Sequence, residues 1–321
     1  MIKLGIVLTR QYRLLSVAAI VDVFETVNGL YRKKNESSPF SITMISPHDS
    51  EHGNTFSSYP ISSVRLAGHL DLIMIPAFST ENIKGAVCEN ADFIPWLMDR
   101  FGGGSEIATF CTGAFLLGAT GMLSGRKATT HLDAFEAFNL NFPAVNLLRD
   151  KIVTGDNGLY TSGGATSSFH LLLHLIQGFC GKETAVKTAK LYAIDMDRVN
   201  QSYFGTFVPA QNHNDELVAM AQQKIEAAYQ SACTIEEMIK DVPASRRNIA
   251  RRFKLVTGIT PIEYLQKTRI EAAKKLLEQT NQQMMEIMLS SGYNDPKAFR
   301  KIFRKTVGMT HTGYRAKFQA A

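Results

Sequence analysis

Phe253-Lys-Leu-Val-Thr-Gly258-Ile-Thr-Pro-Ile-Glu-Tyr264 recurs 50 residues later as Phe303-Arg-Lys-Thr-Val-Gly308-Met-Thr-His-Thr-Gly-Tyr314. Phe, Gly and Tyr keep the same spacing in both copies, a coincidence that chance rarely produces. Two copies are too few for a solenoid, so the repeat predicts two equivalent helical units within one small domain.

Helix start and stop signals precede the first copy. Thr234-Ile-Glu-Glu237 is a capping box that opens a short helix, which Asp241-Val-Pro-Ala244 then interrupts. Ser245 is expected to cap a second helix that runs to Val256. A short helix, a tight turn and a second helix in this order predict a helix-turn-helix.

The same punctuation continues into the second copy. Thr260-Pro-Ile-Glu263 is another capping box, and we expect it to open a long helix that ends near Gln279 and joins the two units. Gly292-Tyr-Asn-Asp is expected to form the second turn, with Asn294 capping the next helix. The C-terminal part is therefore predicted to be all-α with two helix-turn-helix units.

Basic residues crowd the outer faces of the two second helices. Ile249, Phe253 and Val256 form one apolar stripe on the first, which leaves its cations outside. Arg pairs bidentately with guanine in the major groove, and Asn pairs with adenine. The candidate DNA-contacting residues are Ser245, Arg246, Arg247, Asn248, Arg251, Lys297, Arg300, Lys301 and Arg304. For any single cation the alternative is a solvated surface.

Composition and charge support a division into two parts. The chain has 321 residues, of which 45% are hydrophobic and 20% charged, a composition that favours an ordinary globular protein and excludes disordered and fibrous classes. Residues 221–321 carry 18 Lys and Arg against 9 Asp and Glu, whereas residues 1–220 carry 17 against 20. A basic segment joined to a mildly acidic part is typical of a sensing or catalytic domain coupled to a nucleic-acid binder.

Other classes of site lack supporting motifs. No apolar run approaches the ~20 residues of a membrane span, so we expect a cytoplasmic protein without a membrane partner. The four cysteines lie far apart and form no Cys-x-x-Cys pair, which speaks against disulfides and zinc. We expect no metal and no nucleotide cofactor.

The larger part alternates short apolar runs with amphipathic stretches. Strands are expected at residues 3–8, 40–45, 71–75 and 106–110, with helices near 14–30 and 93–100. This alternation predicts a doubly wound, flavodoxin-like α/β domain, whose ligands bind beyond the carboxyl ends of the strands.

One of these strands leads directly into a cysteine. Ile107-Ala-Thr-Phe-Cys111-Thr-Gly is similar to a nucleophile elbow, and Thr129-Thr-His131 supplies an imidazole that can pair with a thiol. A cysteine nucleophile and a structural cysteine both remain open on spacing alone.

Residues 223–318 resemble the AraC/XylS DNA-binding domain. The match is carried by Arg251-Arg-Phe-Lys-x3-Gly-Ile-Thr-Pro-x2-Tyr, Arg269-Ile-Glu-Ala-Ala-Lys-Lys-Leu-Leu277, Gly292-Tyr293 and Phe303-Arg-Lys. The resemblance implies seven helices, with two recognition helices entering successive major-groove faces about 34 Å apart. His311 replaces a usual proline, which is expected to loosen the last helix. Lys297 replaces a small polar residue, which is expected to alter preference at one half-site.

The first part resembles the ThiJ/PfpI branch of the class I glutamine amidotransferase-like fold, and the whole chain resembles GlxA-type regulators. Cys111-Thr-Gly-Ala-Phe, Gly121-Met-Leu-x-Gly-Arg-x-Ala-Thr-Thr-His131, Thr161-Ser-Gly-Gly and Leu173-His-Leu-Ile carry the match. In enzymatic relatives a carboxylate abuts the cysteine, but Ser16 stands at that position here. His170 likewise replaces an Asp that the regulators commonly carry.

Loss of the carboxylate favours binding over catalysis, so no catalytic residue is assigned. The expected ligand-binding residues are Arg10, Ser16, Phe78, Ser79, Cys111, Thr112 and His131. The predicted domains are 1–200 for sensing, 201–222 for a linker and first helix, and 223–321 for DNA binding.

The function expected from these features is a transcription regulator that binds promoter DNA and a small effector, which the resemblance suggests is an amine or amino-acid derivative. Activation is the commoner mode in that family, and a homodimer and contact with RNA polymerase are expected. The alternatives are a cysteine-dependent hydrolase or amidase with a DNA-localising tail, and a thiol redox switch at Cys111.

Overall fold

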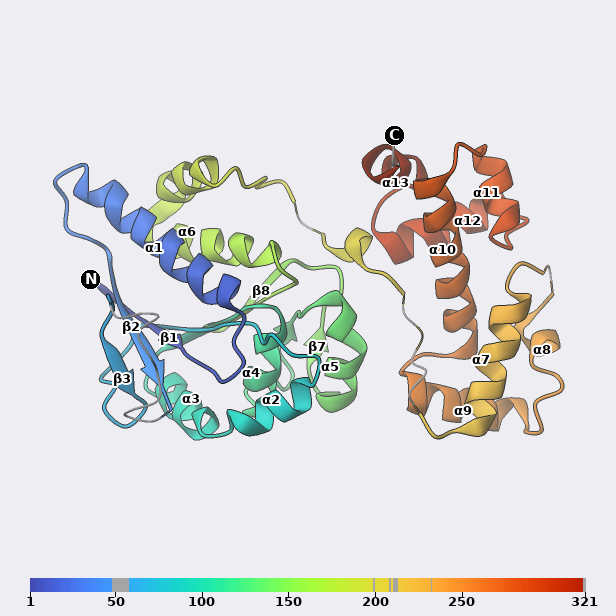
Figure 1. The fold of residues 1–321 in the computed structure, drawn as a ribbon, viewed down its shortest axis with the longest axis horizontal. Helices are drawn as coiled ribbons and strands as arrows, with labels where there is room; N and C mark the ends of the chain where they lie inside the picture. Colours follow the sequence, from blue (N-terminus) through green and yellow to red (C-terminus); the bar gives the residue numbers. More distant parts are fainter. Residues whose placement is uncertain (48–57, 199, 208, 210–212, 232, 320–321) are drawn as a thin grey trace. The chain divides into compact units, whose positions relative to one another are not determined.

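The computed structural model describes residues 1–47, 58–198, 200–207, 209, 213–231 and 233–319. They form two compact units, Met1–Gln201 and Ser202–Ala321, each with cores of its own (Figure 1). The interval 201–222, expected to hold the linker and a first helix, thus lies almost wholly within the second unit. Its residues 208 and 210–212 lie outside the described part of the chain.

A seven-stranded sheet organises the first unit. Its order is β3-β2-β1-β4-β5-β9-β8, and every neighbouring pair is parallel except β8 and β9. The strands are β1 (Ile2–Val7), β2 (Phe40–Ser46), β3 (Ile61–Ser63), β4 (Leu72–Ile75), β5 (Glu106–Thr109), β8 (Val153–Asp156) and β9 (Leu159–Ser162). Short β6 (Lys127–Ala128) and β7 (Asn146–Leu147) pair separately. The predicted doubly wound α/β class is confirmed.

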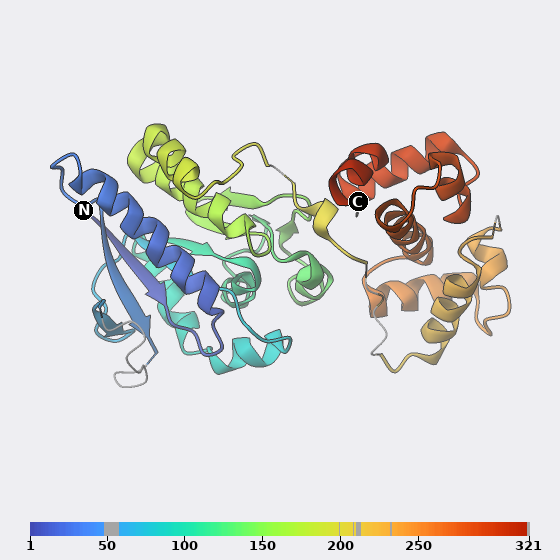
Figure 2. The same ribbon diagram turned by 45° about the horizontal axis from the view of Figure 1, so that its top comes forward.

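Helices cover both faces of this sheet, as a doubly wound fold requires. Figures 1 and 2 show α1 and α6 side by side on one face, where Phe24 and Leu171 join one buried core. Phe93 and Phe115 belong to a second core, on the opposite face. The helices are α1 (Leu14–Arg32), α2 (Ile83–Glu89), α3 (Phe93–Gly102), α4 (Ala114–Ala119), α5 (Phe135–Asn141) and α6 (Ser167–Leu191, interrupted at Gly181).

Helix α1 is, among the described residues, the one helix long and apolar enough to span a membrane by length and composition alone. Its residues Val17, Ile20 and Phe24 are fully buried against the sheet. The helix therefore serves as a core element of this α/β unit.

The second unit consists of helices. They are α7 (Glu216–Ala228), α8 (Ile235–Met238), α9 (Arg246–Thr257), α10 (Pro261–Gln279), α11 (Met284–Ser290), α12 (Pro296–Val307) and α13 (His311–Phe318). Two cores occupy this unit, one around Phe253 and the other around Phe303, and α10 contributes to both. The expected seven helices and the long connecting helix are confirmed in the described part of the chain.

The repeated Phe, Gly and Tyr do the same work in each half. Gly258 and Gly308 end α9 and α12 with φ near +80°, a left-handed conformation that glycine adopts without steric cost. Tyr264 packs edge-on against Phe253, and Tyr314 packs edge-on against Phe303. The spacing of the repeat therefore reflects one arrangement that both halves share: a Phe–Tyr ring contact and a glycine that ends the helix between them.

The N-terminal caps of the helices agree with those predicted from the sequence, except for the cap of α12. Thr234 with Glu237, and Thr260 with Glu263, form the predicted capping boxes. The cap of α12 is Asp295 rather than Asn294, because the Asp295 carboxylate accepts the Lys297 N–H at 2.8 Å and Pro296 occupies the first helical position.

His311 does not prevent the last helix from forming, since α13 begins at this residue. Its imidazole packs against Phe299 and Phe303, with ring centroids 5.5 and 6.2 Å away. Burial, together with Arg300 and Arg315, holds its pKa below the ordinary value.

Candidate ligand pocket and nucleic-acid interface

Cys111 lies at a strained turn directly after β5. Its φ is +53°, an uncommon value for a residue with a side chain, and the chain passes through a single 3-10 turn into α4. The Cys111 carbonyl accepts a hydrogen bond of 2.9 Å from the Thr130 hydroxyl. This geometry agrees with the elbow expected from the sequence.

A cavity of about 190 Å³ opens beside the elbow. It lies where β4 and β5 end and where α1 and α6 begin, as expected for a doubly wound sheet. Its lining consists of Arg13, Leu15, Ser16, Ala19, Ala77, Phe110, Cys111, His131, Ala165, Ser168 and Phe169. Three predicted residues, Ser16, Cys111 and His131, therefore meet in one pocket, and no carboxylate is among these described lining residues.

The Cys111 thiol is poorly suited to nucleophilic attack. It is 7% exposed, and burial raises its pKa, although Arg13 and nearby backbone N–H groups partly oppose that effect. A raised pKa leaves little thiolate at neutral pH. The imidazole of His131 is turned to its own helix, where Nδ1 accepts the Asp133 N–H at 3.2 Å.

The other predicted pocket residues hold nearby loops and do not line this cavity. The Thr112 hydroxyl accepts the Phe78 N–H at 2.9 Å, and Ser79 donates from its N–H to the Gln11 carbonyl at 2.7 Å. Arg10 is fixed through its N–H, which donates to Asn90 Oδ1 at 2.7 Å.

Sequence reasoning missed Arg13, the one cation in the pocket lining. Arg13 is the residue before the first turn of α1, three positions after Arg10, which the sequence predicts in its place. Within the described residues its guanidinium makes no ion pair. The sequence signal for it is its place immediately before the helical pattern, but only the path of the loop decides whether Arg10 or Arg13 faces the cavity.

Gln201, the last residue of the first unit, is a second residue that sequence reasoning missed. Its side chain is 2% exposed and fills the space above the Gly163-Gly164 turn, where a Cβ on Gly163 would lie 1.9 Å from Gln201 Oε1. Gln201 Oε1 accepts the Gly164 N–H at 3.2 Å. Its Nε2 group lies within hydrogen-bond distance of four acceptors: Thr129 Oγ1, Thr130 O, Arg149 O and Lys151 O, at 3.0–3.2 Å.

These contacts connect the pocket wall to the end of the unit. Thr130 precedes the pocket residue His131, and Gly164 precedes the pocket residue Ala165. A Cβ on Gly164 would lie 2.4 Å from the His131 ring, so only glycine allows this approach. We call Gln201 with its five partners the Gln201 latch.

In the second unit, α9 presents the outer face expected from the sequence. Arg247 and Arg251 are exposed, whereas Ile249 and Phe253 are buried beneath them. Ser245 caps the helix by accepting the Asn248 N–H, and Arg246 forms an ion pair with Glu236. Arg252, which was not a candidate, pairs with Asp215 at 2.8 Å and ties α9 to α7.

Helix α12 presents an equivalent face. Phe299, Phe303 and Val307 are buried, and the candidate cations project on the exposed side: Lys297, Arg300, Lys301 and Arg304. Within the described residues none of these four forms an ion pair, so their charges remain available to an anionic partner.

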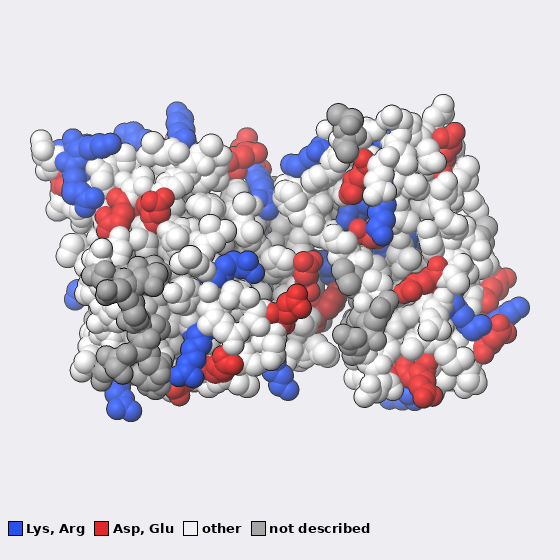
Figure 3. Space-filling model, in the orientation of Figure 1, with Lys and Arg blue, Asp and Glu red and all other residues white. Residues whose placement is uncertain are grey.

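In the view of Figure 3, basic and acidic side chains lie interspersed on the surface of both units. The described residues also contain no group of three or more His, Cys, Asp and Glu that could hold a metal ion.

Comparison with known proteins bears on both units. Residues 54–178 match the DJ-1/PfpI family, and residues 238–317 match a helix-turn-helix domain. The regulator CdhR of Pseudomonas aeruginosa is 26% identical over 66% of this chain and 63% of its own. The regulator GlxA of Rhizobium meliloti is 27% identical, over 64% of each chain. Both are HTH-type transcriptional regulators, and the match spans just under two thirds of either relative.

A solved structure supports the fold. A protein from Vibrio parahaemolyticus, proposed to be a transcriptional regulator, superimposes with a TM-score of 0.51 at 17% identity, over 59% of this chain and 98% of that one. The chain thus joins a DJ-1/PfpI α/β domain to an AraC-type helix-turn-helix domain. Its homologues include the GlxA-type regulators, as the sequence motifs indicated.

Proposed function

We propose that the chain is a sequence-specific transcription regulator whose α/β unit binds a small metabolite. The observation that carries this proposal is the pair of equivalent helices, α9 and α12, each buried on one side and basic on the other. Such helices fit the major groove, where their side chains contact bases and phosphates. The named relatives are regulators, which supports the same function.

The effector we propose is a small amine or amino-acid derivative with a carboxylate. Arg13 would bind the carboxylate, and the rings of Phe110 and Phe169 would contact an amine through cation–π interactions. The cavity of about 190 Å³ lies below the ~300–1,000 Å³ of pockets for drug-sized ligands, which favours a small metabolite.

Binding of the effector in the Cys111 pocket would affect the second unit through the connecting chain. The Gln201 latch holds the last residue of the first unit to the pocket wall. Shortly after it, Lys274 donates to the Gly205 carbonyl at 2.6 Å, and Glu271 accepts the Phe207 N–H at 3.1 Å. The connecting segment is thus fixed at both ends, which would pass a shift of the pocket wall to α10.

Several partners follow from this function. Two copies would place their helices on neighbouring sites, so we propose a homodimer, with activation through contact with RNA polymerase. Such a protein would act in the cytoplasm, where promoter DNA is found.

The cysteine hydrolase is less well supported. The strained elbow is the feature it would require, but the buried thiol with its raised pKa and Ser16 in place of an acid both argue against activation. The same burial argues against a redox switch at Cys111.

The test is selection of sheared genomic DNA by the full chain at about 150 mM salt, where non-specific binding is weak. We expect a few upstream regions that share two half-sites about one helical turn apart. A variant with Arg251 and Lys301 both changed to alanine is the matched control, and it should lose this enrichment. Recovery of the same random DNA by both proteins would contradict the proposal.

A further inference from the structure

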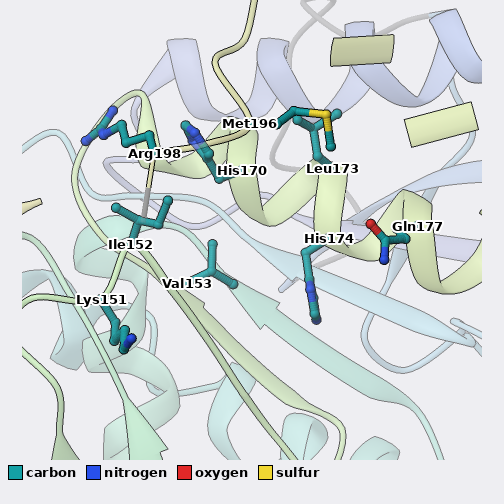
Figure 4. A pocket seen from close by; sticks show the side chains of 9 residues that line it. All are labelled: Lys151, Ile152, Val153, His170, Leu173, His174, Gln177, Met196 and Arg198. Atoms are coloured by element: carbon teal, nitrogen blue, oxygen red, sulfur yellow. The ribbon is translucent and has the colours of Figure 1, made fainter. Parts of the chain in front are cut away.

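A groove of about 320 Å³ lies in the first unit, apart from the Cys111 pocket (Figure 4). Its walls are the edge strand β8, helix α6 and the segment that leads out of the unit. It is lined by Lys151, Ile152, Val153, His170, Leu173, His174, Gln177, Met196 and Arg198. None of these residues lines the Cys111 pocket, and the volume falls within the range of small-molecule sites.

The groove is built by side chains that pin its walls together. His170 Nε2 lies 2.9 Å from the Asp195 carbonyl, and Arg198 donates to Thr166 Oγ1 at 2.8 Å and Ser167 Oγ at 3.1 Å. These bonds hold residues 195–198, which we call the exit segment, against the start of α6. The cavity therefore exists before any ligand arrives, which lowers the entropic cost of binding.

The lining has one sign of charge. Lys151 and Arg198 are cationic, His170 and His174 add imidazoles, and no carboxylate lines the groove among the described residues. The Lys151 ammonium is exposed and forms no ion pair within the described part of the chain. An anion is the complementary partner.

The floor of the same groove is apolar. Val153, Leu173 and Met196 lie between Arg198, toward one end in Figure 4, and Gln177, toward the other. A partner that uses both parts of the lining carries an anionic head and a short apolar body. We propose that this groove is a second ligand site, for a small organic carboxylate with an aliphatic or aromatic chain.

The site has a structural connection to the Gln201 latch. The Lys151 carbonyl accepts from Gln201 Nε2 at 3.0 Å and from Thr129 Oγ1 at 3.0 Å, and Lys151 is one of the residues that line the groove. Helix α6 lines the Cys111 pocket with Ser168 and Phe169, and it lines the groove from the next residue onward, with His170, Leu173, His174 and Gln177. A ligand here would bias the same exit segment from the opposite side of α6.

The test uses 4-phenylbutyrate and its charge-reversed counterpart 4-phenylbutylamine, titrated calorimetrically into the full chain. We expect saturable binding of the carboxylate and none of the amine. Lys151→Glu should weaken carboxylate binding at least about fivefold, because it turns an attraction into a repulsion without touching the backbone bonds of Lys151. Lys84→Glu, at an exposed site without an ion pair in the described chain, is the matched control and should leave binding unchanged.

Two further variants locate the ligand. Met196→Ala removes an exposed part of the floor and should weaken binding, whereas Arg13→Gln in the Cys111 pocket should not. Equal binding of the amine, binding lost in Arg13→Gln, or no binding up to about 10 mM would overturn the proposal. A change of oligomeric state in Lys151→Glu by sedimentation would also overturn it, because a second copy would then cover the groove. None of these outcomes depends on DNA binding.

Discussion

The Gln201 latch makes a quantitative prediction for Gln201→Ala. The substitution strands the Gly164 N–H and removes two amide N–H donors, which four acceptors share, in a site that is 2% exposed at Gln201. A stranded buried polar group costs about 1–3 kcal/mol, and a residual cavity adds to it. We therefore expect the first unit to lose about 2–4 kcal/mol of unfolding free energy.

The chain supplies its own probe for this measurement. Trp96 is the single tryptophan, it belongs to the first unit, and it is 8% exposed. Its fluorescence during urea unfolding therefore follows this unit alone. With an m-value of about 2–3 kcal/mol/M, the midpoint should fall by about 1 M.

Gln177→Ala is the matched control, since Gln177 is exposed and no hydrogen bond of its side chain is found in the described chain. It should stay within about 0.5 kcal/mol of the parent. If Gln201→Ala also stayed within that margin, the latch would not stabilise the unit, and the proposed transmission would lose its physical basis. If the latch transmits effector binding, Gln201→Ala should still bind DNA, but its affinity for DNA should no longer change when small betaines and amino acids are added.

Three further predictions concern other parts of the molecule. Gly292→Ala should destabilise the second unit by more than about 2 kcal/mol in circular dichroism melts, because Gly292 has φ +86° and a Cβ there would lie 2.3 Å from the Tyr229 carbonyl; an unchanged melting temperature would refute this steric argument. Because the pKa of His311 is lowered, the contribution of this residue to the stability of the second unit is complete above its unfolded pKa of about 6.5 and is lost as pH falls below that value. His311→Pro should flatten this dependence between pH 7.5 and 5.5, and an unaltered slope would show that another group causes it. Maleimide at pH 7 should label exposed Cys88 well before Cys111, as peptide mass spectrometry can show. Preferential labelling of Cys111 would instead support the cysteine hydrolase.

Local signals explain why the second unit was predictable. Capping boxes, the αL glycines and the apolar stripe of α9 each involve residues only a few positions apart. Each can therefore be recognised in a short stretch of the sequence. The one error, Asn294 instead of Asp295, arose because both residue types make good caps and only the register of Pro296 decides between them.

The pocket was predictable only where a residue follows a strand or opens a helix. Ser16, Cys111 and His131 were found for that reason. Arg13 was missed because the path of a short loop, not its composition, determines which arginine faces the cavity. Gln201 and the Gly163-Gly164 turn meet 37 residues apart through tertiary packing, which no periodic pattern in the sequence records.

The long α6 and the antiparallel pair of β8 and β9 also escaped prediction. The apolar pattern of α6 crosses Gly181, whose φ of +83° breaks the helical geometry inside the segment. The strands β8 and β9 have four residues each, too few for alternation to separate them from a loop.

The central claim is that α9 and α12 contact two separate half-sites, and a cycle of protein and DNA substitutions tests it most directly. Affinities are measured for the parent, Arg251→Ala and Lys301→Ala, each on the selected site and on versions with one half-site scrambled. We predict that each substitution weakens binding to the intact site by about 1–3 kcal/mol. On DNA in which the half-site of that helix is scrambled, the same substitution should weaken binding almost no further, whereas scrambling the other half-site should still have its full effect. Equal costs on every DNA, scrambled or intact, would assign both residues to phosphates and contradict the claim that these helices read sequence.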